Sequence, residues 1–181
     1  MQMKHVRHWF FMGLLTWLVG CSPSENWRVI TLYDYGVTAM IPCKPDEAQR
    51  QVPMPGGAAP LEMRSCELDG TTYAVAWLPV QSADQGEAAM RAWLQGSLAS
   101  ARVTAPSAVE RIDVPHAQQA WRWRGEGQSQ GQSLRIEFHF VHQGKWLVQL
   151  ATFQRGENKL RDFETFWGGL TLPKSQVPLG Q

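Results

Sequence analysis

One short stretch has the residue types and spacing of a nucleophilic serine. Gly127, Ser129 and Gly131 match the pattern G-x-S-x-G, in which the serine attacks a carbonyl from a sharp turn between a strand and a helix. Here glutamines flank the serine, and the alternating apolar and polar residues of 134–141 predict a strand rather than a helix. The context favours a flexible hairpin loop over a catalytic site.

The histidines and carboxylates form no compact motif for metal binding or acid-base chemistry. His139 and His142 would point to opposite faces of an extended strand, and His116 lies well before both. A metal site would therefore have to be assembled by folding from distant residues, and no spacing shows two carboxylates converging on a cleft. We assign no catalytic residue, no metal ligand and no cofactor.

The segment Trp121-Arg122-Trp123-Arg124 has the residue types of a binding surface. In a strand, Trp121 and Trp123 share one face and the two arginines share the other. We favour the interpretation that the two tryptophans fill the space between a sheet and its helices. The alternative is a surface that binds a glycan or an apolar protein segment, and the exposure of the two rings distinguishes these cases.

The amino terminus has the order of a secretory signal. Residues 1–8 carry two basic residues and no acidic one, 9–19 form an apolar run broken only by Gly and Thr, and Gly20 is small. Crossing the hydrocarbon core takes about 20 apolar residues, roughly twice the length of this run. The pattern favours a signal peptide over residues 1–20 rather than a transmembrane helix.

The end of this signal, Leu18-Val19-Gly20-Cys21, resembles a bacterial lipobox. The resemblance implies that a diacylglyceryl group is attached to the Cys21 thiol, that a peptidase cuts before Cys21, and that the new amino group is acylated, for instance with palmitate. Two or three chains hold a protein at a membrane without a transmembrane helix, since each buried methylene adds ~0.8 kcal/mol. Ser22 stands where Asp typically marks retention in the inner membrane, so the same resemblance favours the outer membrane.

Lipidation of Cys21 would leave two cysteines, Cys43 and Cys66. In an oxidising compartment such a pair usually forms a disulfide, and a loop of this length predicts a stabilisation of about 3 kcal/mol. No C-x-x-C occurs and no histidine stands near either cysteine, which argues against a metal site. Two free buried thiols are the remaining alternative.

Composition indicates one domain with a substantial core. The 181 residues are 44% hydrophobic and 18% charged, and removal of residues 1–20 takes two of 17 basic residues and none of 16 acidic ones. The mature chain is therefore close to neutral, without the basic surface that nucleic acid binding needs. We expect a tether over 21–26, a single domain over 27–172 and a flexible tail over 173–181.

The apolar patterns predict mainly strands. The predicted strands are 27–33, 37–41, 61–68, 71–79, 109–114, 118–124, 134–141 and 145–153. Asp69-Gly70 is a strong hairpin signal, whereas the prolines of 42–60 predict an irregular segment. Ser82 and Gln85 match a capping box for an amphipathic helix that ends near Val103 and packs on the domain's own sheet, and a second helix is predicted over 158–168.

This order predicts an α+β domain, an antiparallel sheet with helices packed on it. The element order over 27–172 and the segments Ile41–Pro45 and Asp69–Tyr73 resemble the PsbP-like fold, a layered sandwich found in a photosystem II extrinsic subunit, a nuclear import factor and several bacterial lipoproteins. Members of that fold mostly act as binding or accessory modules. The resemblance carries no catalytic residue to this chain.

Two function hypotheses follow from these observations. The first is a lipid-anchored, noncatalytic accessory or binding protein of the bacterial cell envelope, with an envelope protein or a glycan as partner. A chaperone-like groove for an apolar protein segment is one form of it and needs an exposed apolar trough. The alternative is an envelope hydrolase acting on peptidoglycan or lipid, which needs a pocket holding Ser129 within reach of a histidine and a carboxylate.

Overall fold

The computed structural model describes residues 25–34, 36–103, 107–156 and 163–174. Strands account for 53% of these residues and helices for 16%. The strands are β1 (Arg28–Thr31), β2 (Thr38–Ile41), β3 (Asp46–Met54), β4 (Gly57–Leu68), β5 (Thr71–Pro79), β6 (Glu110–Arg111), β7 (Gln119–Ser129), β8 (Gln132–Gln143) and β9 (Trp146–Arg155). The helices are α1 (Gly86–Ser100), α2 (Glu164–Gly168) and a 3-10 turn (Ala83–Gln85) that leads into α1.

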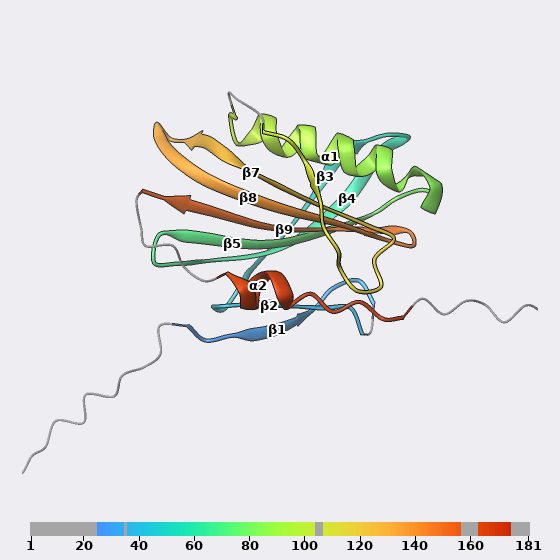
Figure 1. Ribbon diagram of the computed structural model, residues 1–181, viewed down its shortest axis with the longest axis horizontal. Helices are drawn as coiled ribbons and strands as arrows, with labels where there is room; N and C mark the ends of the chain where they lie inside the picture. Colours follow the sequence, from blue (N-terminus) through green and yellow to red (C-terminus); the bar gives the residue numbers. More distant parts are fainter. Residues whose placement is uncertain (1–24, 35, 104–106, 157–162, 175–181) are drawn as a thin grey trace, which may run out of the picture.

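Seven strands form one antiparallel sheet in the order β3-β4-β5-β9-β8-β7-β6 (Figure 1). Short turns join most neighbouring strands, which explains why chain order and sheet order largely agree. At the predicted hairpin between β4 and β5, Asp69 and Gly70 have positive φ angles of 48° and 74°. This is the backbone that a tight hairpin turn requires, and it confirms the prediction made from Asp69-Gly70.

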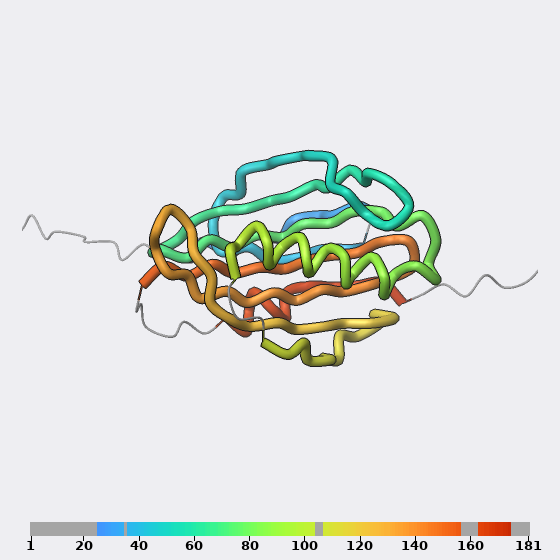
Figure 2. The backbone as a smooth tube through the Cα atoms, turned by 90° about the horizontal axis from the view of Figure 1, so that it is seen from above, coloured from blue at the N-terminus to red at the C-terminus, as the bar shows by residue number. Residues whose placement is uncertain are grey.

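The two faces of the sheet are covered differently (Figures 1 and 2). Helix α1 lies along the strands on one face, here called the helix face, and packs on apolar residues such as Leu78, Ile136 and Phe140. The small β1–β2 sheet and α2 cover the other face, here called the hairpin face, where Val75, Val148 and Phe166 are buried. The sheet is thus the middle layer between two separate cores.

The predicted α+β class, a PsbP-like sandwich with helices packed on the sheet, is wrong. The fold is mostly β, and α1 is the one long helix within the described residues. The two-stranded sheet covers most of the hairpin face. Of the second predicted helix, only Glu164–Gly168 is helical among the described residues. Residues 157–162 of that prediction lie outside the described residues.

The irregular segment predicted for residues 42–60 is also wrong. It forms most of a long hairpin, β3–β4, which turns at Gly56 and Gly57 with φ angles of 90° and 132°. Its prolines are tolerated because they lie at an edge: Pro53 is in the outermost strand, and Pro60 precedes the point where β4 begins to pair with β5. A high proline content therefore did not exclude a strand at this position.

Paired or buried residues lie near both ends of the described part of the chain. β1 begins at Arg28, Thr171 pairs with Thr38, and Leu172 is buried. No helix in the described part of the chain is long and apolar enough to cross a membrane. The predicted signal peptide over 1–20, together with Cys21, lies outside the described residues.

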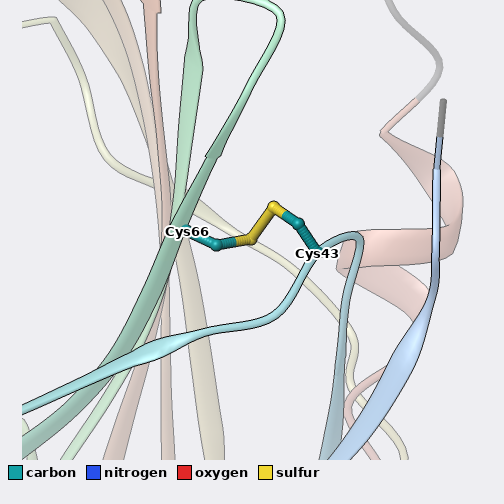
Figure 3. Close-up of a disulfide and its surroundings, with 2 residues drawn as sticks. All are labelled: Cys43 and Cys66. Atoms are coloured by element: carbon teal, nitrogen blue, oxygen red, sulfur yellow. A yellow bond between two sulfur atoms is a disulfide. The ribbon is translucent and has the colours of Figure 1, made fainter.

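A disulfide between Cys43 and Cys66 connects the main sheet to the layer that covers its hairpin face (Figure 3). Cys43 follows β2, Cys66 lies in β4, and their Cα atoms are 6.0 Å apart. The bond confirms the predicted pairing and attaches the small sheet to the main one. It indicates an oxidising, extracytoplasmic compartment, where such bonds persist.

The β1–β2 turn contains a tyrosine that should make stability fall at alkaline pH. Tyr33 stacks on Trp146 with ring centroids 4.3 Å apart and donates a hydrogen bond to Gln143 Oε1 at 3.1 Å. Burial, and then the charge of Asp34, raise the pKa of Tyr33 to about 12. Since this pKa exceeds the ordinary value of 10.0, the neutral phenol stabilises the fold fully below pH 10 and loses that effect as the pH rises towards 12.

A Tyr33→Phe variant should therefore lose part of this alkaline dependence. The measurement is the urea midpoint of both proteins at intervals between pH 9 and pH 12. We expect the midpoint of the wild type to fall more steeply over this range than that of the variant. Identical slopes would contradict the assignment.

The carboxyl end of α1 is docked on β7 at a glycine. Gln128 N donates a hydrogen bond to Ala101 O at 2.9 Å, and a Cβ at Gly127 would lie 2.4 Å from that same oxygen. Gly127→Ala should therefore lower the free energy of unfolding by about 1–3 kcal/mol, measured by urea unfolding. Gly96→Ala, where a Cβ meets nothing within 4 Å, should instead raise it by roughly 0.5–1 kcal/mol. Equal stability of the two variants would contradict this packing.

Candidate functional site

An open groove of about 550 Å³ lies on the helix face, between α1 and the β3–β4 hairpin. Helix α1 and the strand β3 form its two walls, and strands β5, β8 and β9 form its floor. Figure 2 shows how this arrangement arises, since the β3–β4 hairpin lies beside α1 rather than beneath it. One side of the helix face is thus left partly uncovered.

The groove is deep because the side chains of its floor are short, three of them being alanine. Ala74 and Ala76 are on β5, Ala151 is on β9, and Ala74 stands directly opposite Ala151 in the register. Under the rest of α1, the same face of the sheet carries large rings, including Trp121 and Phe140. Those rings fill the space beneath the helix, whereas the alanines leave it empty.

The lining of the groove is largely apolar, and several of its apolar side chains are only half-buried. Val52, Met54 and Met63 of the hairpin and Phe153 of β9 pack against the helix-face core but stay partly exposed. Unbranched, polarisable methionine adapts to ligands of irregular shape. These side chains can therefore cover an apolar molecule that enters the groove.

Some of the polar side chains that line the groove have hydrogen-bonded partners. Gln149 is buried in the floor and donates a hydrogen bond to Ser97 Oγ of α1 at 3.1 Å. The charged residues among the described lining are Arg50 and Arg155, and no acidic residue is among them. Arg155 Nη1 donates to both carboxylate oxygens of Glu67, at 3.0 and 3.2 Å. The groove is thus apolar inside, with positive charge at its margin.

The aromatic platform considered for Trp121 and Trp123 is not present. The two residues are 5% and 1% exposed and lie in the helix-face core. The ring of Trp123 stacks on Phe138 with centroids 5.6 Å apart, and the guanidinium of Arg91 lies over Trp121. Both rings fill the space between sheet and helix, so they cannot contact a glycan or protein segment without unfolding.

Ser129 lines the groove, but its backbone differs from that of a nucleophile elbow. It is the last residue of β7, and the turn at Gln130 and Gly131 leads directly into β8. The turn thus joins two strands, whereas a nucleophile elbow joins a strand to a helix. The described lining of the groove brings neither a histidine nor a carboxylate to Ser129.

The two strand histidines occupy opposite faces of β8, as their spacing predicts. His142 faces α1, where its ring packs on Gly86 and its Nε2 lies 2.9 Å from Gly144 O. His139 faces the other way and stacks on Trp167 of α2, with centroids 4.0 Å apart. The described residues contain no cluster of three metal-ligating side chains.

A polar network surrounds His139 on the hairpin face. Glu137 accepts hydrogen bonds from His139 Nε2 at 2.8 Å and from Arg124 Nε at 3.0 Å. Burial alone would raise the pKa of Glu137, but these hydrogen bonds and charges outweigh it and lower the pKa. The carboxylate is thus held ionised, and the network attaches α2 to the sheet through Trp167.

Sequence reasoning missed the groove. Its floor depends on Ala74 and Ala151, which are 77 positions apart and become neighbours only through the pairing of β5 with β9. One wall is part of residues 42–60, the segment wrongly predicted to be irregular. The detectable signal was the alternation of alanine with larger residues in 73–77, which places two small side chains on one face of a strand.

These features define a mostly β protein in which a seven-stranded antiparallel sheet carries an apolar groove between one helix and an edge hairpin. No protein-family model matches the chain, and a search of curated proteins finds no significant match.

Proposed function

We propose that this chain is a noncatalytic binding protein of the bacterial cell envelope, and that its groove binds an apolar ligand. One observation carries the proposal: a groove of about 550 Å³ with an alanine floor and half-buried apolar walls. Sites for small ligands typically measure about 300–1,000 Å³ and are mostly apolar, with a few placed polar groups. The Gln149–Ser97 pair and the marginal arginines supply such groups.

The proposed location rests on the disulfide and on the amino terminus. The Cys43–Cys66 bond supports an oxidising compartment, and the lipobox resemblance supports a lipid anchor at Cys21, with the outer membrane favoured by Ser22. The first strand after the expected tether, β1, lies on the side of the main sheet opposite to α1 (Figure 1). The groove would therefore open away from the point where the anchored chain enters the domain.

The test is a titration of the purified protein with N-phenyl-1-naphthylamine, an uncharged apolar probe whose fluorescence rises on leaving water. We expect saturable enhancement with one site per chain, and displacement of the probe by a long-chain alcohol. Absence of saturable enhancement would contradict the proposal. Hydrolysis of p-nitrophenyl butyrate that Ser129→Ala abolishes would instead support the envelope hydrolase.

A further inference from the structure

We propose that the ligand of the groove is a long-chain fatty acid, with its acyl chain on the alanine floor and its carboxylate at Arg50, at the margin of the groove. This inference rests on the proposed function, because it requires that the groove bind apolar molecules at all. It is carried by two independent properties of the groove, its size and the sign of its charge.

The size of the groove favours a single extended chain over a protein helix. The groove of about 550 Å³ is in the size range typical of sites for small ligands. Helix recognition uses anchors at i, i+3, i+4 and i+7, which takes about two turns.

The charges that line the groove favour an anion. Arg50 of the β3 wall is exposed and makes no ion pair within the described residues, and Arg155 stands where β9 ends. Arg155 and its partner Glu67 are both about half exposed, so water weakens their ion pair and leaves the arginine available. A planar carboxylate matches the two parallel N–H donors of a guanidinium.

The combination selects a fatty acid among the common amphiphiles. The low part of the floor is confined to the neighbouring residues Ala74, Ala76 and Ala151, which suits one chain rather than two. A carboxylate is also the smallest anionic head, so it reaches an arginine at the margin while the chain stays in the groove. Uncharged chains lack this second interaction and should bind more weakly.

The experiment compares dodecanoate with dodecanol, which share one chain and differ in charge. The mature chain, residues 21–181, carries Cys21→Ser, so that neither the apolar run of the signal nor an acyl group on its own terminus competes, and binding is measured by calorimetry. We expect dodecanoate to bind about tenfold more tightly than dodecanol, as a charge-assisted hydrogen bond provides. Arg50→Gln should reduce this preference for dodecanoate, and Arg155→Gln should reduce it less.

Arg111→Gln is the matched control, because Arg111 is an exposed arginine on β6, at the opposite edge of the sheet. It should leave the preference for dodecanoate unchanged. All three substituted side chains are exposed or half-exposed, so circular dichroism should show the same folded state in each variant.

Several other results would overturn the fatty acid assignment. Equal binding of dodecanoate and dodecanol, unaffected by the arginine variants, would overturn the fatty acid assignment and leave the proposed function intact. Binding of neither compound would overturn the proposed function as well. Tighter binding of lysophosphatidylglycerol, or of an amphipathic helical peptide, would overturn the assignment in favour of a lysophospholipid or of the chaperone-like role.

Discussion

A Cys43→Ser/Cys66→Ser variant is expected to lose about 3 kcal/mol of unfolding free energy relative to the oxidised wild type. The disulfide closes a loop with a sequence separation of 23 residues, and its removal restores that conformational freedom to the unfolded chain. The measurement is urea unfolding without reductant. The wild type in the presence of a reductant is the control, and it should unfold at the same midpoint as the variant.

The loss should be greatest in the layer that the disulfide attaches. Cys43 follows β2, so hydrogen exchange of the β1 and β2 amides should accelerate more than that of β8 and β9, which lie in the middle of the large sheet. Uniform acceleration of all strands would contradict this assignment. A variant within about 0.5 kcal/mol of the oxidised wild type would show that the bond adds little stability.

The second large effect is expected from a substitution that fills the groove. Gly96 lies on α1 at the edge of the groove, and a Cβ built there meets nothing within 4 Å. Gly96→Trp should therefore place a large ring in the groove without displacing the core. We expect the affinity for N-phenyl-1-naphthylamine to fall at least about tenfold, because the apolar area that the probe buries is already covered.

The folded state of this variant should be preserved. Tryptophan is a better helix residue than glycine, so the unfolding temperature should not fall. Ala88→Trp is the matched control, since Ala88 is an exposed position of the same helix that does not line the groove. It should bind the probe as the wild type does. Equal loss in both variants, or no loss in either, would place the probe elsewhere.

Local signals predicted the β4–β5 hairpin and the disulfide. Asp69-Gly70 specifies a turn with positive φ angles through its own two residues, and the alternating run 134–141 places its side chains on two faces whatever the rest of the chain does. The Cys43–Cys66 pair followed from counting cysteines in an oxidising compartment. Each of these predictions depends on few residues and little tertiary context.

The fold class and the groove depend on tertiary context, and there the sequence was insufficient. The prolines of 42–60 are compatible with strands because that hairpin lies at the edge of the sheet, a position that composition does not reveal. The apolar spacing in 158–168 predicted a full helix, yet helix is found only at Glu164–Gly168 among the described residues. The groove floor required the register of Ala74 against Ala151.

The most direct test of the proposed function is the location of a bound apolar molecule. Isotope-labelled protein would be titrated with dodecanol while its backbone amide and methyl resonances are recorded. We expect shifts at Met54, Met63, Ala74, Gly96 and Ala151, which line the groove from its walls and its floor, with small changes on the hairpin face around Trp146. Shifts confined to the hairpin face, or none at saturation, would contradict it.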